Sequence, residues 1–537
     1  MKVSRSPFPH LPALTLALLV SVASAGMAAA QNVSNEAWLG QVGGLNVLDI
    51  TQEGRGNSAG ADNVWLLLGQ QGVSNSLVLD QFGYDNKLGT LFGDQPRYAR
   101  GVWQRGDLNV MSIVQRNTEL GGTNVLGSVQ QWSAFNQGVN SDAFNSLTVI
   151  QTSLDDPTGI GGHYIGRIVQ VNNRQGDAAH NAVTITQQGG GEGLGNVLAN
   201  LRQVGSGNSF TSLQTGSANR VGEIPPAGEL PIGGILQRGA ENVASLEQRG
   251  TSNLVEYIQQ YGELNSAQLT FSGSRNVLSQ LLQNNESWIV GAIGNRTVVT
   301  ITGDDNGGEG GWVGELIAFP SLATPGIAQA VLAQLGDDND ISLAILSGME
   351  SKYGVTQVGD GNDVHISISG LAGADAFRNE TAVFQKGNVN YVSHTVTGDD
   401  NAGAVRMEGE GNRLVLVQRE SFNVARVTIT GDMNNAPSAP LFGVAAELVA
   451  SLAEETLFPG RIVQIGLGGE PDDANSAELD VLGSGNAFTA YQNGLGNHLL
   501  GSIAGDGNAL AVLQTGNRNT TLSRQAGSAN SAAIQQF

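Results

Sequence analysis

The chain has 537 residues, with 48 acidic and 26 basic side chains and a formal net charge of −22. So acidic a protein repels phosphate backbones, which excludes nucleic acids from the expected partners. Cysteine is absent, so packing and backbone hydrogen bonds must stabilise the fold without disulfides.

Residues 1–30 are typical of a secretory signal peptide. Lys2 and Arg5 form a basic start, residues 11–22 are mostly apolar, and small residues precede Gln31. Cleavage after Ala25 is an alternative to cleavage before Gln31. The apolar run is shorter than the ~20 residues that span a bilayer. We therefore expect a secreted protein with no transmembrane segment in its mature chain.

A short phrase, Gln-x-Gly-x-x-Asn, then recurs almost to the C-terminus, with apolar residues two and four places before the glutamine. Its copies include those that begin at Gln41, Gln52, Gln70, Gln81, Gln203, Gln214, Gln492, Gln514 and Gln525. In further copies an apolar residue replaces the glutamine, at Phe271, Ile301, Val396, Met407, Ile429, Val481 and Ile503. Many neighbouring copies lie eleven residues apart. A short fixed period predicts one array of repeats rather than several globular domains.

The residues before each glutamine indicate a β-strand. Leu48, Ile50 and Gln52 alternate with polar or outward residues, and Leu77, Leu79 and Gln81 repeat this pattern. A period of two puts the apolar side chains and the amide on one face of an extended strand. The repeats are therefore expected to be strands and not helices.

The Gly-x-x-Asn half of the phrase predicts a tight turn. Glycine supplies positive φ angles, and asparagine bonds nearby backbone groups. The asparagines expected to brace these turns include Asn46, Asn57, Asn208, Asn497, Asn519 and Asn530. Two units make a strand-turn-strand arch of about 22 residues, and stacked arches bury their apolar faces and align their amides in ladders. The predicted fold is an all-β solenoid, or cross-β stack.

The regularity of the repeats divides the chain. Residues 31–283 are predicted to form solenoid repeats with insertions near 152–165 and 221–233, and residues 284–480 degenerate repeats with insertions near 307–330 and 435–460. Regular repeats return over residues 481–537. The spacing of apolar residues predicts short helices over 444–457 and 327–335, as excursions from the rungs.

The repeated phrase resembles the curlin repeat, the building unit of the extracellular bacterial amyloid fibres called curli. Residues 46–57 (NVLDITQEGRGN), 75–86 (NSLVLDQFGYDN) and 510–519 (LAVLQTGNRN) carry the resemblance most closely, and Gln203 followed by Gln214 gives both strands of one unit. The resemblance covers most of the mature chain, densely in three blocks and loosely over 284–480. The chain departs from the pattern in its length, its apolar replacements and its proline-bearing insertions.

The resemblance implies a structural protein and not an enzyme. Members of the family are secreted, fold at the cell surface as cross-β solenoids and support adhesion and biofilm formation. It also implies a homopolymer, or a polymer with related curlin subunits, together with a nucleator and an outer-membrane secretion pore. Neither a cofactor nor a metal is implied. Whether the chain is a major subunit, a minor or nucleating subunit, or a monomeric relative stays open.

Two alternatives come from other classes. A β-helix carbohydrate-active enzyme would use clustered carboxylates, and the candidates are the pairs Asp304 and Asp305, Asp337 and Asp338, and Asp399 and Asp400. All occupy turn positions, so solvated turn residues are the favoured interpretation. A monomeric solenoid adhesin stabilised by calcium would need acidic turns throughout, but many turns lack aspartate and the step is eleven residues rather than nine.

Overall fold

The structure of the chain is a computed structural model. It describes residues 19–21, 36–37, 40–42, 45–59, 69–71, 74–89, 102–106, 108–119, 122–133, 144–154, 162–172, 180–189, 196–205, 207–222, 233–255, 257–278, 280–285, 294–307, 330–346, 350–369, 379–399, 401–420, 423–436, 460–466 and 474–537. Within these ranges the chain is all-β, and no helix occurs.

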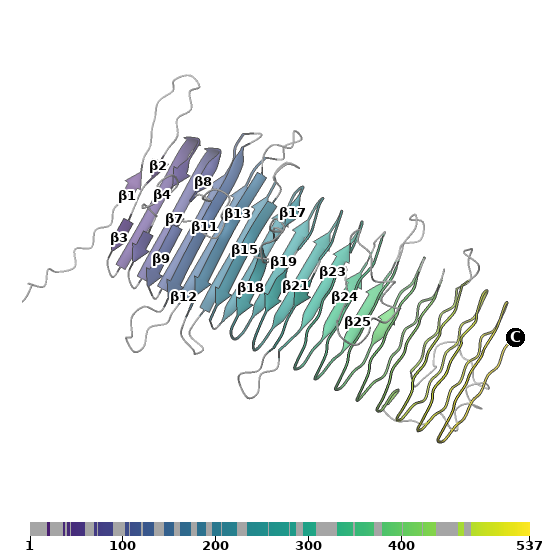
Figure 1. Cartoon of the computed structure of the whole chain (residues 1–537). Helices are drawn as coiled ribbons and strands as arrows, with labels where there is room; N and C mark the ends of the chain where they lie inside the picture. The colour runs from purple at the N-terminus through teal and green to yellow at the C-terminus, as the bar shows by residue number, and fades with distance from the viewer. Residues whose placement is uncertain are drawn as a thin grey trace, which may run out of the picture.

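Successive turns of the chain stack side by side along one axis, from the N-terminal end in purple to the C-terminal end in yellow (Figure 1). The first parallel sheet, which we call sheet A, has its strands in chain order. They are β1 (Leu19–Ser21), β4 (Leu45–Arg55), β7 (Ser74–Tyr84), β10 (Leu108–Arg116), β12 (Phe144–Thr152), β14 (His180–Gln188), β16 (Asn208–Thr215), β19 (Val243–Arg249), β21 (Ser266–Ser272), β23 (Thr297–Thr302), β24 (Ile341–Ile345), β25 (Val364–Ile368) and β26 (Ser393–Thr395).

The second parallel sheet, sheet B, is built from the strands that alternate with these along the chain. Its main path is β2 (Glu36–Ala37), β5 (Ser58–Ala59), β8 (Asn86–Leu88), β11 (Thr123–Ser133), β13 (Gly162–Val171), β15 (Asn196–Val204), β18 (Gly234–Arg238), β20 (Ile258–Gln260) and β22 (Leu281–Leu282). Beside this path lie β3 (Gly40–Val42), β6 (Gly69–Gln71), β9 (Val102–Gly106) and β17 (Asn219–Arg220). Each turn of the chain therefore adds one rung, with a segment in each sheet.

The predicted alternation is confirmed by the burial of the strands. In β7, residues from Ser74 to Tyr84 alternate between buried and more exposed, with Leu77 and Leu79 facing the core. The parallel register places Leu77 beside Leu48 on one side and Met111 on the other. Equivalent side chains thus stack in rows, and burial of these rows supplies the main driving force for folding.

The motif glycines allow neighbouring turns to approach closely. Gly83 has φ of 137°, and a Cβ atom added to it would lie 1.6 Å from the carbonyl oxygen of Gly54 on the preceding rung. A residue with a side chain would clash there and also adopt a disfavoured backbone conformation. The turn spacing between rungs therefore requires glycine at this position.

The most regular part of the sequence differs from expectation. The sequence predicts strands over residues 481–537. In the described chain beyond β26, however, the strand pairing is limited to an isolated parallel bridge between Ala511 and Ala533. Gln492, Ile503 and Gln514 take φ values of 71°, 58° and 56°. Positive φ at these positions breaks the extended conformation that regular strand pairing needs. Rungs continue here through side-chain ladders and scattered backbone bonds.

One helix prediction is partly wrong. Over 330–335 the chain is not helical, and Leu332 and Gln334 are buried in the stack. The other predicted helix, 444–457, lies outside the described residues, as do most of the predicted insertions. Residues 162–165, predicted as the end of the first insertion near 152–165, belong to β13.

The predicted signal segment contributes one described strand. β1 pairs in parallel with β4, with Leu19 beside Asp49 and Ser21 beside Thr51. The remainder of residues 1–30 lies outside the described chain. Nowhere in the described ranges does a helix reach the length and apolar character needed to cross a membrane.

Candidate functional site: the amide ladders

Buried glutamines of sheet A form a ladder along the solenoid axis. Gln81 occupies the register position of Gln52, and its Nε2 donates to Gln52 Oε1 at 2.8 Å. Bonds of 2.7–2.8 Å then join Gln81, Gln115, Gln151, Gln187, Gln214 and Gln248 in turn. We call this series the sheet A glutamine ladder. Because these amides are buried, each depends on its neighbours for hydrogen bonds that water cannot supply.

A second series, the sheet B glutamine ladder, lies on the other sheet. Its amides are joined at 2.7–2.9 Å through Gln104, Gln131, Gln170, Gln203, Gln237 and Gln260. The ladder is interrupted after Gln260, because the oxygens of Gln260 and Gln283 are buried without a partner. It resumes from Gln283 through Gln334, Gln357 and Gln385 with bonds of 2.6, 2.8 and 3.2 Å. Gln70 is buried at the preceding position, where its backbone pairs with Gln104.

The spacing of the repeated phrase follows from bonds that each unit makes within itself. Gln52 Nε2 donates to the carbonyl oxygen of Ser58 at 3.0 Å, six residues later, and Gln203 makes the equivalent bond to Ser209 at 2.8 Å. Asn57 Nδ2 donates at 3.2 Å to the carbonyl of motif residue Gly54. The glutamine thus fastens the two ends of the turn, and the asparagine fastens its middle.

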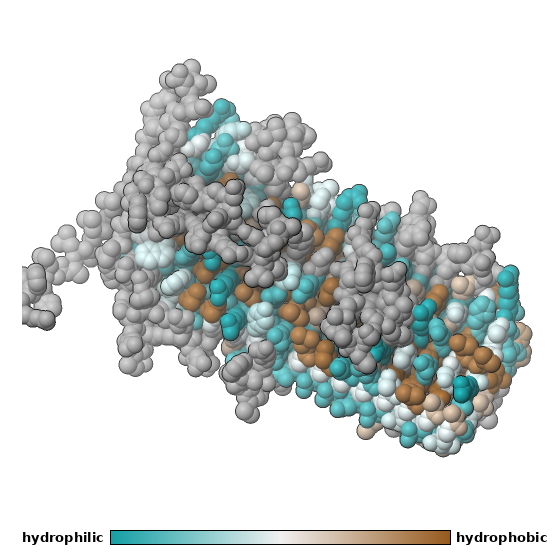
Figure 2. All heavy atoms as spheres, viewed as in Figure 1, coloured by the Kyte–Doolittle hydropathy of each residue, from teal (hydrophilic) through white to brown (hydrophobic). Residues whose placement is uncertain are grey.

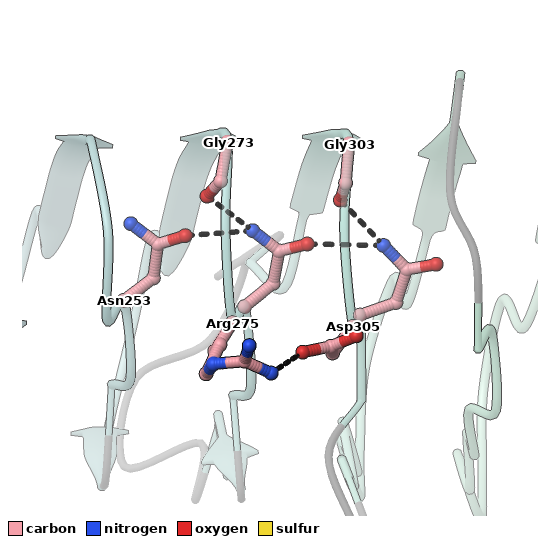
Figure 3. A network of polar contacts seen from close by, with 7 residues as sticks. Asn253, Gly273, Arg275, Gly303 and Asp305 are labelled. Carbon is pink, nitrogen blue, oxygen red and sulfur yellow. Dashed lines mark hydrogen bonds and ion pairs between the residues drawn. The ribbon is translucent and has the colours of Figure 1, made fainter.

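The asparagines also stack into two ladders of their own. One begins with Asn46, whose Nδ2 donates to Asn75 Oδ1 at 2.9 Å, and the other with Asn57, which donates to Asn86 at 2.9 Å. Figure 3 shows the second ladder around Asn253, where Asn276 donates to Asn253 Oδ1 at 2.7 Å and to the Gly273 carbonyl at 3.0 Å. Each asparagine therefore bonds both its own turn and the adjacent rung.

The predicted residues fall into these ladders as follows. Those with ladder bonds are Gln52, Gln81, Gln203, Gln214, Gln492, Gln514, Asn46, Asn57, Asn208, Asn497, Asn519 and Asn530. Gln41 pairs with Gln70 through its backbone, and its side chain lies outside the described atoms. Gln525 instead bonds Ser531 within its own turn.

The apolar replacements interrupt the two glutamine ladders at different rungs. On the sheet A side the buried replacements are Phe271, Ile301, Ile345, Ile368 and Val396. The same rungs keep sheet B glutamines, at Gln260, Gln283, Gln334, Gln357 and Gln385.

Farther along the chain, the apolar replacements lie on the sheet B side instead. Met407, Ile429, Val481 and Ile503 are buried five residues before asparagines of the Asn46 ladder. On the sheet A side the same rungs keep Gln418, Gln464, Gln492 and Gln514, of which the last three are joined by bonds of 2.6 Å. Every rung from Gln70 onward therefore keeps at least one ladder glutamine, although neither ladder is continuous.

Several ladder glutamines escape a search for the full phrase. Gln115, Gln151 and Gln187 lack the following Gly-x-x-Asn, because their turns differ in sequence or length. The available signal is the alternation before them, as in Met111, Ile113 and Gln115. A search for apolar-x-apolar-x-Gln would have found these positions.

His163 occupies a position in the Asn57 ladder. Its Nδ1 lies 3.2 Å from Asn124 Nδ2, and its Nε2 lies 2.9 Å from the carbonyl oxygen of Gln188. A neutral imidazole satisfies both contacts, accepting at Nδ1 and donating at Nε2. Burial lowers the pKa of His163 to about 4, which keeps the ring neutral.

The acidic pairs considered as catalytic candidates lie in turns. Asp305 pairs with Arg275 beside the Asn276 turn (Figure 3). Asp337 accepts from Asn285 Nδ2 at 2.7 Å, and burial together with Asp360 and Asp338 raises its pKa. Asp400 lies outside the described residues. Within the described ranges, no group of three or more His, Asp or Glu side chains could hold a metal ion.

The face seen in Figure 2 carries apolar side chains in short patches between polar ones, rather than in one continuous surface. No known family model, curated protein or solved structure matches this chain. The function must therefore be argued from the ladders themselves.

Proposed function

We propose that this chain is a structural subunit of extracellular, curli-like amyloid fibres, which assembles by stacking its β-arch rungs. The observation that carries the proposal is the set of aligned Gln and Asn ladders in parallel, in-register rungs. Aligned amides and rows of apolar side chains are the features that stabilise cross-β assemblies.

The ladder energetics favour assembly over isolated rungs. A hydrogen bond contributes about 1 kcal/mol net, whereas a buried amide without a partner costs about 1–3 kcal/mol. A rung alone therefore gains little, and a rung added to an existing stack gains on all its ladders together. We further propose that each rung has about 22 residues, as between Gln492 and Gln514, and that insertions enlarge the rungs elsewhere.

The remaining parts of the proposal follow from the sequence and its resemblance to curlin repeats. The chain would be exported after loss of residues 1–30 and would act at the bacterial cell surface in adhesion and biofilm formation. Its partners would be further copies or related subunits, a nucleator and an outer-membrane secretion pore.

The test is assembly of the chain from Gln31 onward after dilution from denaturant, followed by thioflavin fluorescence and electron microscopy. Fibres that form after a lag, and whose lag is removed by preformed seeds, support the proposal. A β-rich monomer that never elongates would contradict it and would favour a monomeric solenoid adhesin.

A further inference from the structure

A groove of about 970 Å³ follows one edge of the solenoid, outside the turns of the Asn46 ladder. We call it the edge groove. One wall consists of the residues that follow the ladder asparagines, which are Arg296, Asp340, Asp363, Tyr391 and Arg413. The other wall consists of residues that precede them, which include Leu264, Gly294, Asp338, Gly361, Val389, Gly411 and Met433. Parallel stacking thus aligns side chains from consecutive rungs into a linear site.

The centre of the edge groove carries two carboxylates on adjacent rungs. Asp340 and Asp363 precede the paired residues Ile341 and Val364, and Ile341 N donates to the Asp363 carbonyl at 3.2 Å. Burial raises the pKa of both side chains. At Asp340 the charge of Arg296 lowers the pKa in part, whereas at Asp363 the charge of Asp340 raises it further. Asp363 Oδ1 is buried without a hydrogen-bond partner. Oδ1 itself is covered by protein atoms, but the Asp363 side chain is only half-buried, so its carboxylate can accept from a ligand that donates.

Donors and an aromatic ring flank these acceptors. Arg296 Nε lies 3.7 Å from Asp340 Oδ2, and the Arg413 guanidinium lies 4.4 Å from the centre of the Tyr391 ring. Val389 and Met433 are 66% and 64% exposed on the facing wall. The edge groove consequently combines acceptors, donors and apolar surface within five rung steps, a length on the order of 24 Å.

The charges narrow the class of ligand. A phosphate polymer would meet three carboxylates and a chain of net charge −22. A divalent cation prefers several convergent oxygen ligands, and no such metal-binding group occurs in the described part of the chain. A neutral molecule with many hydroxyl groups satisfies carboxylates as a donor and guanidinium groups as an acceptor, and its C–H surface packs on apolar side chains.

We propose that the edge groove binds a neutral polysaccharide chain along the solenoid axis, with a sugar hydroxyl donating to the half-buried Asp363 carboxylate. Asp340 accepts a second hydroxyl, Arg296 and Arg413 donate to sugar oxygens, and the apolar wall contacts the C–H face of the sugar rings. The site is separate from the glutamine ladders, so binding does not depend on whether the chain forms fibres.

The test is calorimetric titration of the full mature chain with cellohexaose and maltohexaose as neutral probes and hexagalacturonate as an acidic one. At least one neutral hexasaccharide should bind, and Asp363→Asn should weaken it about tenfold, because a neutral amide oxygen is a weaker acceptor than a carboxylate and the new NH₂ group cannot accept from a hydroxyl. Asp49→Asn removes an equal charge from an exposed position on sheet A and should leave affinity unchanged.

Tyr391→Ala provides a second variant in case Asp363→Asn alters the fold, and circular dichroism of both variants should match that of the parent chain. Tyr391→Ala should weaken neutral binding severalfold. Absence of binding by both neutral hexasaccharides would overturn the proposal. So would binding of hexagalacturonate alone, or neutral binding that neither variant reduces.

Discussion

Phe271 lies directly beside Gln248 in sheet A, at the register position that the next ladder amide would occupy. Gln248 Nε2 donates to Gln214 at 2.7 Å, but Gln248 Oε1 is buried without a partner. The sheet A glutamine ladder therefore ends here with an unsatisfied oxygen. An amide in the middle of a ladder should be worth more to stability than the amide at its end.

Replacement of Gln151 by leucine tests this difference. The change removes the bonds to Gln115 and Gln187, both 2.8 Å long, and leaves buried polar atoms on two rungs. Gln248→Leu is the matched control, since it disturbs one ladder bond and also removes an unpaired oxygen. Urea unfolding should show Gln151→Leu to be less stable than Gln248→Leu by about 1–3 kcal/mol. Equal midpoints would contradict the ladder argument.

Gly83→Ala should destabilise the chain through its turn. The new Cβ would lie 1.6 Å from the Gly54 carbonyl oxygen, at a backbone φ of 137°. Backbone would have to move, at a cost of several kcal/mol. Gly398 is a motif glycine with nothing within 4 Å of an added Cβ, so Gly398→Ala is the control. Thermal unfolding should separate the two variants clearly, and similar losses would argue against close turn stacking.

Acid should destabilise the fold through its buried histidines. Burial lowers the pKa of His163 and His394 to about 4, below the unfolded value of about 6.5. The unfolded chain then binds more protons as the pH falls. Their contribution to stability is complete above pH 6.5 and is lost between pH 6.5 and 4. At pH 5 each histidine should lower the free energy of unfolding by about 2 kcal/mol.

His163→Asn checks this expectation by restoring the residue type of the ladder between Asn124 and Asn196. Urea midpoints measured at pH 7 and pH 5 should differ less in this variant than in the parent chain. The exposed His180 provides His180→Asn as a control that keeps the parent response. If both variants respond to acid like the parent chain, the buried ring does not carry the effect.

Period-two alternation was sufficient to predict the strands and the inward-facing amides. Leu77, Leu79 and Gln81 face the core together, because the pleat puts every second side chain on one face. The phrase also predicted the turns, since the glutamine and asparagine bond backbone at fixed separations. The phrase could not predict that the apolar replacements lie on the sheet A side up to Val396 and on the sheet B side from Met407. That change depends on which sheet each copy of the phrase joins.

The departures have physical causes in particular residues. Gln115 and Gln151 were missed because the search required a turn sequence that their longer connections do not keep. The C-terminal repeats fit the phrase best, yet positive φ at Gln492 and Gln514 interrupts regular pairing there. The edge groove was not predicted, because Asp340 and Asp363 are separated along the chain and come together only through stacking.

Fibre nucleation should respond to ladder amides more than to turn charges. Gln514 Nε2 lies 3.2 Å from Gln536 Oε1, and its own oxygen accepts from Gln492 at 2.6 Å. Combined replacement of Gln514 and Gln525 by leucine should therefore change the thioflavin lag time severalfold. Asp304 and Asp305 are half-buried in a turn where Asp305 pairs with a largely exposed Arg275, a contact worth at most about 1 kcal/mol. Their combined change to asparagine is the control.

Single variants divide the effect between the two glutamines. Gln514 belongs to a ladder, whereas Gln525 bonds Ser531 in its own turn and follows the apolar Ile503 in the stack. Gln514→Leu should thus account for most of the change in lag time, and Gln525→Leu for little. Equal lag times for the glutamine and aspartate double variants would show that nucleation does not pass through the amide ladders, because only the first removes a bond between rungs at the core.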